Sequence, residues 1–434
     1  MKDVGIRTVV LAVAAGLALV ATPAAAQSTS LAGAAEVSTD QATLAVEVRD
    51  EIERLRKELD ALRQEYERRI GTLEQRLGAL SGPSAVERPA AGEPAPATQA
   101  QAYSNSSTVF NPNISAVGNF IGLAGDNPES PDPSLQLTEA EVAFQAVVDP
   151  YAKADFFLSA GPDGVEIEEG YVTFTTLPAG LLLKAGKMRA QFGKVNTMHT
   201  HILPWADRPL VMQNLMGGDE GLSDAGFSVS RLIPNNFMFL EATGEVFRGD
   251  SEVFQTDERS RLVYLGRLRG YRDLTDDTNV DLGVSFTHGP TDVGADLDKR
   301  LVGVDATLRW RPLRRAIYRR FVWRTEFVWS RQDRPLNPIG PGPAVLRQAF
   351  GFYSSADYQF ARRWYIGARV DRSGRVLDAA LTDSGGSVYL TFWPSEFSQV
   401  RGQYRRTAYA EGVTANELLF QLNFSIGAHG AHVF

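Results

Sequence analysis

His199 and His201, separated only by Thr200, are the residues of this chain best suited to binding a metal ion. Side chains two positions apart on an extended backbone point to the same side, so the two imidazoles and a nearby carboxylate could hold a zinc-like ion. The alternative is that the pair belongs to a hydrogen-bonded loop without a metal. The spacing therefore predicts a candidate metal site at these two histidines.

The sequence offers little for catalysis. It has five histidines and contains neither a G-x-S-x-G elbow nor an H-E-x-x-H helix motif. The adjacent carboxylates Glu168 and Glu169 would point to opposite faces of a strand and could not share a proton. The chain has no cysteine, which excludes disulfides and thiolate metal sites. We expect no enzyme activity and no cofactor. The alternative is a membrane-embedded hydrolase whose serine and histidine are not marked by a known motif.

The N-terminal residues predict export. Lys2 and Arg7 precede an apolar stretch at 9–20, and three alanines at 24–26 provide a small-residue cleavage site. This pattern is typical of a secretory signal peptide spanning residues 1–26. Cleavage removes two positive charges and one negative charge, which changes the formal net charge from −8 to −9. An acidic mature chain gives no electrostatic reason to expect nucleic acid as a partner.

Residues 38–81 predict a long helix with a coiled-coil seam. The segment opens with the capping pattern Ser38-x-x-Gln41, and no proline follows until Pro83. Its apolar residues are spaced alternately by four and three, with one stutter after Tyr66. They are Val48, Ile52, Leu55, Leu59, Leu62, Tyr66, Ile70, Leu73, Leu77 and Leu80. We expect self-association, with a single amphipathic helix lying on the rest of the chain as the alternative. Residues 82–102, which contain four prolines, predict a linker.

Residues 103–434 alternate between apolar and polar side chains, as in strands with two different faces. In the last segment Leu418, Phe420 and Phe424 share one face, and Gln421 and Asn423 share the other, whereas Leu419 breaks the polar face. The pattern predicts about sixteen antiparallel strands. They start near residues 113, 135, 150, 164, 180, 225, 235, 259, 277, 299, 318, 345, 362, 384, 395 and 414.

The connections between these segments indicate how the strands are arranged. Every second connection is tight, as at Asp149-Pro150 and Pro394-Ser395, and most of the others are longer and polar. Short turns on one side and long loops on the other are typical of a transmembrane β-barrel in an outer membrane. A soluble β-sandwich is the alternative, but so long a run of alternation without an extended apolar core segment is hard to place in one.

A ladder of arginines lies on the face opposite the apolar one, so these residues are candidates to line the lumen of such a barrel. The arginines are Arg261, Arg267, Arg269, Arg309, Arg324, Arg369, Arg401 and Arg405, and the acidic residues on the same faces are Asp305, Glu326, Asp357 and Asp371. Fixed charges in a narrow lumen bias which ions enter it, and arginine suits carboxylate and phosphate oxygens. The ladder predicts a preference for anions or small acidic solutes, unless the acidic residues cancel the field.

The longest connection, from about Phe192 to Asp224, is a candidate to fold into the lumen and constrict it. It carries the two histidines described above. Its other candidate constriction residues are Trp205, Asp207, Asp219 and Glu220.

Three segments carry a resemblance to a known family. LTEAEVAFQAVVDPYAKADFFLSAG (137–161), VEIEEGYVTFTTLPAGLLLKAGKMRAQFGK (165–194) and the terminal FSIGAHGAHVF are similar to Gram-negative outer-membrane porins, in particular porins related to the phosphate-selective O and P types. The resemblance covers the chain from about residue 110 to the end. It implies a sixteen-strand barrel, a homotrimer in outer-membrane lipid, and passive diffusion of small hydrophilic solutes. The phosphate-binding ladder of that family cannot be matched here residue by residue.

Together these features predict an outer-membrane porin of a Gram-negative bacterium with its coiled coil in the periplasm. One alternative is a membrane anchor whose coiled coil tethers the outer membrane. Another is a metal-related outer-membrane receptor. A larger plugged transporter would need about 22 strands, and too few residues remain for them.

Overall fold

The computed structural model describes Lys57 and residues 112–427, except 130–131, 163, 292–296, 336–343, 377 and 379. The predicted signal peptide (1–26), coiled coil (38–81) and linker (82–102) therefore lie outside the described residues, apart from Lys57. The barrel falls within one compact unit of the chain, Gln99–Phe434.

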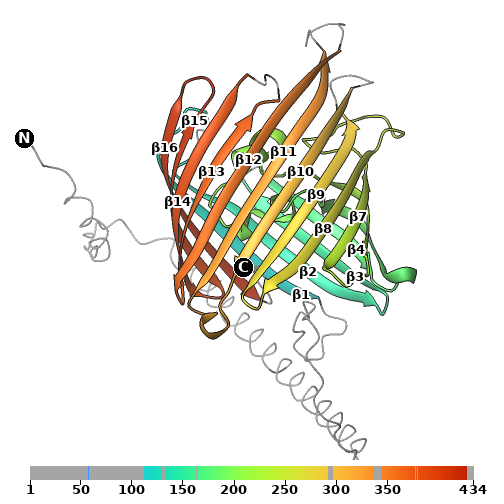
Figure 1. Ribbon diagram of the computed structural model, residues 1–434, viewed down its shortest axis with the longest axis horizontal. Helices are drawn as coiled ribbons and strands as arrows, with labels where there is room; N and C mark the ends of the chain where they lie inside the picture. The colour runs from blue at the N-terminus through green and yellow to red at the C-terminus, as the bar shows by residue number, and fades with distance from the viewer. Residues whose placement is uncertain are drawn as a thin grey trace, which may run out of the picture. The chain divides into compact units, whose positions relative to one another are not determined.

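Sixteen strands form a single closed barrel (Figure 1). They are β1 (Asn113–Asp126), β2 (Leu135–Asp149), β3 (Ala152–Gly161), β4 (Gly164–Phe174), β5 (Leu181–Arg189), β6 (Ser223–Leu232), β7 (Phe239–Phe247), β8 (Val263–Thr275), β9 (Thr278–Pro290), β10 (Asp298–Trp310), β11 (Arg320–Pro335), β12 (Ala344–Ala361), β13 (Trp364–Gly374), β14 (Thr382–Ser395), β15 (Ser398–Ala408) and β16 (Thr414–Gly427). Each begins within four residues of its predicted start. The predicted fold of the barrel is confirmed.

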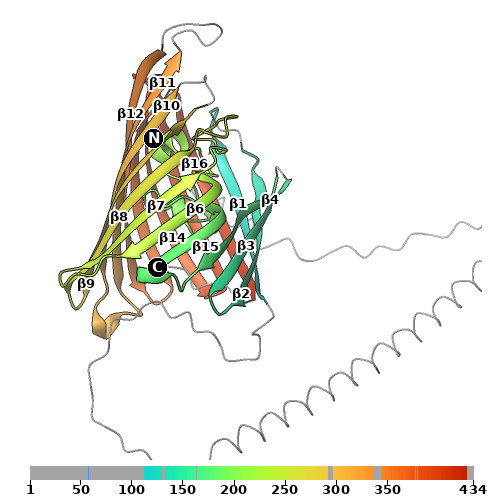
Figure 2. The same cartoon turned by 90° about the vertical axis from the view of Figure 1, so that its right-hand side faces the viewer.

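Each strand pairs antiparallel with its neighbours in sequence, and β1 pairs with β16 to close the ring (Figure 2). The closing register runs from Ser115 opposite Gly427 to Asp126 opposite Asn416. Closure leaves no row of unpaired backbone groups at a sheet edge, so a barrel can satisfy its backbone hydrogen bonds without water on its outer surface.

The two faces of the barrel differ sharply in polarity. On β16 the side chains of Leu418, Phe420 and Ile426 are 57%, 46% and 67% exposed, whereas Gln421 between them is 1% exposed. The same alternation holds on β8 to β15, where apolar residues face outward and polar ones are buried. Outward aromatic rings on β11 and β12 stack on one another, as Phe327 does on Phe352 at 5.7 Å. An apolar outer surface of this kind suits lipid rather than water.

No helix among the described residues is long and apolar enough to cross a membrane.

The connections follow the predicted alternation of lengths over part of the barrel, although residues 175–180 and 233–238, which join β4 to β5 and β6 to β7, are longer than the predicted tight turns. Two-residue turns join β2 to β3, β8 to β9, β12 to β13 and β14 to β15 at one end of the barrel, which is the lower end in Figure 1. At the same end, residues 311–319 between β10 and β11 are longer and contain the 3-10 helix η4 (Leu313–Arg315). At the other end, β3 and β4 are joined by a tight turn although its neighbours are long. We refer to these ends as the short-turn end and the long-loop end.

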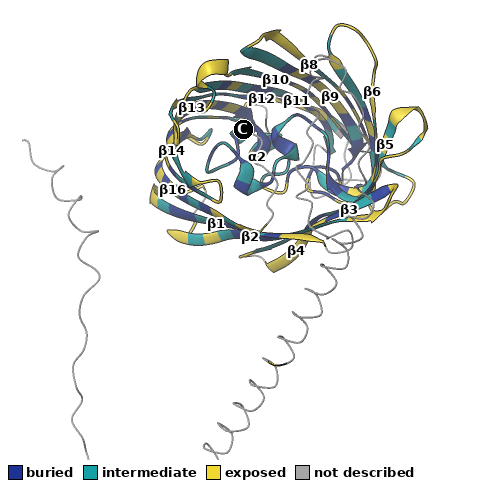
Figure 3. Ribbon diagram, turned by 90° about the horizontal axis from the view of Figure 1, so that it is seen from below, coloured by how far each residue is buried: buried dark blue, intermediate teal, exposed yellow. Residues whose placement is uncertain are grey.

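The longest connection, residues 190–222, lies inside the barrel (Figure 3). It contains two 3-10 helices, η2 (Val195–Thr197) and η3 (Thr200–Ile202), and the short helix α2 (Leu210–Leu215). We call this segment the inner loop. Its apolar side chains pack against inward-facing residues of the wall to form a fully buried core. That core includes Phe192, Leu203, Trp205, Val211 and Met212 of the loop, and Phe247, Leu301, Val328 and Tyr353 of the strands.

Candidate functional site

The first part of the inner loop is fixed to the wall by a glutamate of β11. The buried carboxylate of Glu326 accepts hydrogen bonds from the backbone N–H groups of Lys194 and Val195 at 3.0 and 2.8 Å, and from the Tyr353 hydroxyl at 3.1 Å. Gly193 has a φ of 60°, and a Cβ there would collide with this carboxylate. A glycine is therefore required at the point where the loop turns back toward the wall.

The middle of the inner loop is fixed by Asp207. Its carboxylate receives hydrogen bonds from Arg369 at 2.8 Å, from Arg405 at 3.0 Å and from the Gln403 amide at 2.5 Å. Burial alone would raise the pKa of Asp207, but the two arginines outweigh it and lower the pKa to about 2. Next to it, Trp205 is fully buried against Tyr353, with the Arg369 guanidinium 4.9 Å from its ring centre.

A group of buried acids surrounds the two histidines. His199 Nδ1 lies 2.6 Å from Glu141 of β2, and its Nε2 lies 3.1 Å from Glu169 of β4. His201 Nδ1 lies 3.3 Å from Glu139 of β2. The structure therefore brings His199 and His201 together with carboxylates, although His201 lies in η3 rather than on the extended backbone that the prediction assumed. We call Glu139, Glu141, Glu168, Glu169, His199 and His201 the histidine–glutamate cluster.

Glu168 and Glu169 both point into the barrel, so the prediction that they occupy opposite faces is wrong. The reason is a β-bulge, because Phe157 pairs with Glu169 while Leu158 pairs with Ile167, which leaves Glu168 as an extra residue. A bulge interrupts the strict alternation of faces. Glu168 uses this position to reach the Arg189 guanidinium and to lie 3.2 Å from His199 Nδ1.

The cluster favours the charged form of His199. Burial opposes its protonation, but hydrogen bonds to Glu141, Glu168 and Glu169 outweigh that effect and raise the pKa well above its usual range. In the absence of another cation, a protonated His199 therefore joins the inner loop to β2 and β4 through its hydrogen bonds to Glu141 and Glu169.

A cavity of about 870 Å³ opens beside the cluster on the side of the long-loop end. Its lining includes nine carboxylates and four arginines, so the cavity is strongly acidic. The predicted constriction residues Asp219 and Glu220 lie here with exposed side chains, and Asp207 and Arg405 line the same space. We call this space the outer vestibule.

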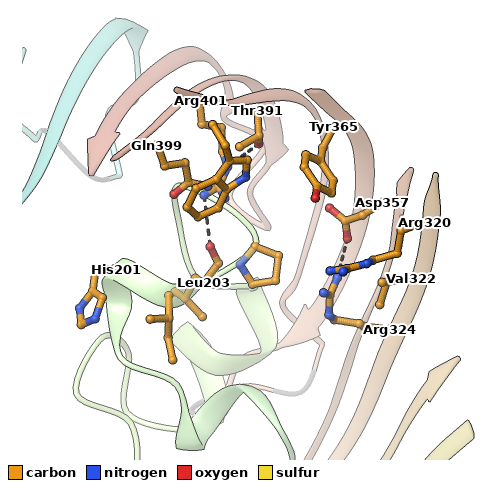
Figure 4. A pocket seen from close by; sticks show the side chains of 13 residues that line it. His201, Leu203, Arg320, Val322, Arg324, Asp357, Tyr365, Thr391, Gln399 and Arg401 are labelled. Carbon is orange, nitrogen blue, oxygen red and sulfur yellow. Dashed lines mark hydrogen bonds and ion pairs between the residues drawn. The ribbon is translucent and has the colours of Figure 1, made fainter. Parts of the chain in front are cut away.

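A second, smaller cavity of about 70 Å³ lies against residues 201–204 of the inner loop and the wall strands β11 to β15 (Figure 4). Its charged lining is basic, with Arg320, Arg324 and Arg401 against the single carboxylate of Asp357. Arg324 donates to Asp357 at 2.5 Å, and Arg401 donates to the backbone oxygen of Leu203 at 3.2 Å. We call this space the inner chamber.

The charged residues of the predicted ladder occupy the inward faces of their strands, except Arg261, which precedes β8. Most of them form ion pairs. The pairs are Arg261 with Asp298, Arg267 with Asp305, Arg269 and Arg309 with Asp281, Arg324 with Asp357, Arg369 with Asp207 and Asp371, and Arg405 with Asp207 and Glu417. Arg369 and Glu326 are deeply buried and hold the inner loop. Arg269 is the most exposed of the paired arginines on the strands, at 39% of its side chain.

Sequence reasoning missed three groups at this site. Glu139 and Glu141 are two residues apart on a strand, so the sequence could predict that they share a face. Nothing in the sequence predicted that His199 would contact that face. Lys194 lies beside the basic residues Arg269 and Arg309, because all three contact Asp281, Lys194 at 3.4 Å. The sequence could not predict this contact, since it depends on the path of the inner loop. Gln403 holds both the Ala206 N–H and Asp207, a role that only the folded loop reveals.

No family model matches the chain. An uncharacterized protein of Aquifex aeolicus (strain VF5) is 29% identical over 338 residues, which cover 69% of this chain and 70% of that protein.

Three solved structures are similar to the barrel at low sequence identity, each over 73% of this chain. A loop-deletion mutant of OmpT, an outer-membrane protein of Vibrio cholerae, is 10% identical, with 99% of its chain covered and a TM-score of 0.49. The outer-membrane channel DcaP of Acinetobacter baumannii is 11% identical, with 96% covered and a TM-score of 0.49. OprB of Pseudomonas putida is 11% identical, with 94% covered and a TM-score of 0.49.

Proposed function

We propose that this protein is an outer-membrane porin, which forms a water-filled channel for the passive diffusion of small hydrophilic solutes. The observation that carries the proposal is the closed barrel with apolar side chains outside and charged side chains inside. Lipid is the natural solvent for such an outer surface, and water for such a lumen.

The inner loop supports a size limit for the channel. It crosses the lumen and is fixed to strands on several sides, through Glu326 of β11, Arg369 of β13 and Asn423 of β16. Solutes that pass between the outer vestibule and the inner chamber must travel between this loop and the wall. The loop fills part of the lumen with tightly packed side chains, which favours inorganic ions and small organic solutes over larger ones.

The arrangement of the connections supports an orientation in the membrane. Short turns face the periplasm and long loops face outward in barrels of this type. The N-terminal end of β1 and the C-terminal end of β16 both lie at the short-turn end, which supports a periplasmic position for the predicted coiled coil (38–81). Three barrels side by side would bring three such helices together, so we propose a homotrimer with a periplasmic coiled coil.

Charge in the inner half of the lumen supports a preference for anions or small acidic solutes. Near the short-turn end, Lys194, Arg269 and Arg309 surround the single carboxylate of Asp281. The adjacent inner chamber is also basic. The outer vestibule is acidic and opposes this preference at the mouth, so selectivity depends on the narrower inner half. The proposal covers anions and small acidic solutes in general and does not include a specific preference for phosphate.

Planar-bilayer recording tests the proposal. We expect large stepwise conductances and a reversal potential that indicates anion preference across a salt gradient. Replacing Arg309 and Arg324 with Ser should shift the reversal potential toward cations, because the narrow inner half loses two positive charges. The matched control is Arg300→Ser, which removes a charge from the outward face of β10.

Two results would contradict the proposal at different levels. An absence of conductance would favour the anchor or receptor alternative over a porin. Conductance with unchanged selectivity in the double variant would keep the porin and reject the arginine ladder as its selectivity filter.

A further inference from the structure

We infer that the histidine–glutamate cluster is a binding site for a divalent transition-metal ion such as Zn²⁺, which would join the inner loop to β2 and β4. One ligand atom from each of Glu139, Glu141, Glu168 and His199 can be chosen so that all four lie within 4.8 Å of one another, and all four residues are buried. The histidine comes from the loop and the glutamates come from the wall. The inference does not depend on whether the barrel conducts.

The distances between donor atoms suit a metal centre. His199 Nδ1 lies 2.6 Å from a Glu141 oxygen and 3.2 Å from a Glu168 oxygen. Ligands held about 2.1 Å from a zinc ion are roughly 3 to 3.5 Å from each other. Small side-chain movements would therefore admit an ion in place of the shared proton of His199.

The cluster has an excess of negative charge. The cluster contains four glutamates, at 139, 141, 168 and 169, and the nearby arginines are Arg189, which pairs with Glu168, and Arg208, which Asp219 shares. With neutral histidines, four negative charges and two positive charges leave a deficit equal to one divalent cation. Glu141 has ion pairs only with His199 and His201 among the described residues. Buried carboxylates without a matching cation are costly, so a bound divalent ion would stabilise this arrangement.

Glu139 gives an independent indication of a missing partner. Its residue is only 6% exposed, and its Oε2 atom has no hydrogen-bond partner among the described residues. Buried polar atoms in folded proteins nearly always have a partner, and an ion is one way to provide it. The same glutamate belongs to the four-residue group that could share a metal.

The surroundings of the cluster allow an ion to enter. Glu139, Glu168 and Thr200 line the outer vestibule, whose acidic surface would attract cations from outside. The mixed set of imidazole and carboxylate donors suits Zn²⁺, Mn²⁺ or Fe²⁺. Ca²⁺ takes six to eight oxygen ligands, so we expect it to compete poorly.

Calorimetric titration of the full-length protein in detergent, after treatment with a chelator, tests this inference with Zn²⁺ as the probe. We expect one ion per chain, and an affinity reduced by at least about a hundredfold when Glu141→Gln and His199→Gln are combined. The matched controls are Glu166→Gln, in the same vestibule but outside the cluster, and His288→Gln, on β9. Both controls should leave the affinity unchanged.

Unchanged Zn²⁺ affinity in the double variant, or an equal loss in the controls, would overturn the inference. If the double variant fails to fold, X-ray absorption by the zinc-loaded wild-type protein decides. Nitrogen and oxygen ligands with an imidazole signature support the site, and a shell of oxygen alone rejects it. Zinc should also slow hydrogen exchange of residues 198–204 in the wild-type protein, since the ion would tie the loop to two strands.

Discussion

Asp207 is the residue on which the inner loop most depends. Three side chains from two strands converge on its carboxylate, and the same arginine that binds it also lies over the ring of Trp205. Without this carboxylate, Arg369 would keep only Asp371 and Arg405 only Glu417, and both of those acids belong to the wall rather than to the loop. Removing one partner of such a network costs more than a single surface ion pair contributes.

We expect Asp207→Asn to destabilise the packed position of the inner loop by about 1.5 to 3 kcal/mol, because the two arginines lose the carboxylate that links them to the loop while keeping their partners on the wall. The barrel should persist, while single-channel recordings become noisier as the loop detaches. The matched control is Asp219→Asn on the same loop, where the side chain is 76% exposed. Equal noise in both variants would contradict the assigned role of Asp207.

The pKa of Asp207 also fixes the pH range in which this attachment survives. A carboxyl whose pKa falls from its unfolded value of about 3.9 to about 2 stabilises the fold above pH 4 and loses that contribution as the pH drops through 2. Mild acid should therefore leave the Asp207 contacts intact.

Lys194 gives the lumen a charge that can be titrated under mild conditions. Burial lowers its pKa, and neighbouring Arg309 lowers it further against the opposing effect of Asp281, to about 8. Raising the pH from 7 to 9.5 should therefore remove about one positive charge from the inner half of the lumen and weaken anion preference. Reversal potentials measured across this range should change with a midpoint near pH 8.

Lys194→Arg provides the control for this pH effect. Arginine keeps its charge throughout the range, so the change in reversal potential should disappear. A change that persists in the variant would assign the titration to another group.

At the scale of elements, the bulge in β4 shapes the histidine–glutamate cluster. One extra residue turns two adjacent glutamates toward the same lumen, where a regular strand would present only one. On either side of the bulge, β4 pairs with β3 in a regular register. The bulge therefore adds a buried carboxylate without changing the rest of the barrel.

Deleting Glu168 should accordingly be tolerated by the barrel, because it converts the bulge to a regular ladder. Deleting Gly170 also removes the bulge, but it moves the charged Glu169 into the outward position that Gly170 occupies, so we expect it to destabilise the barrel. The measurement is the difference in migration between unheated and boiled samples on a detergent gel, which reports a folded barrel. Loss of the folded band in both variants would contradict the assignment of Glu168 as the extra residue.

The strands could be predicted because the alternation of apolar and polar residues lies within each strand's own sequence. Apolar residues every second position and turn residues between them fixed all sixteen starts to within four residues. The bulge could not be predicted, since Glu168 and Glu169 look like any other neighbouring pair. The contacts of Asp207 and His199 also could not, because their partners are more than 20 residues away and are chosen by the path of the inner loop.

At the scale of the whole molecule, the predicted coiled coil is the part that would set assembly. It lies outside the described residues, and its seam at Leu55, Leu59 and Leu62 is known from sequence alone. Replacing all three leucines with Asp should dissociate trimers, or free the three helices while the barrels stay associated. Chemical cross-linking and light scattering distinguish these states. A peptide of residues 38–82 that stays monomeric and unfolded at high concentration would contradict the coiled coil.

The pairing of β1 with β16 has a consequence for how the chain folds. Ala116 lies opposite Ile426, so the last hydrogen-bonded ladder joins positions separated by about three hundred residues. The inner loop also makes contacts between residues distant in sequence, because it touches both Glu141 of β2 and Asn423 of β16. Contacts so distant in sequence form slowly, because much chain entropy is lost before they stabilise the fold. The barrel can therefore close, and the inner loop can make all its contacts, only after β16 is available for pairing. Until then β1 keeps an unpaired edge.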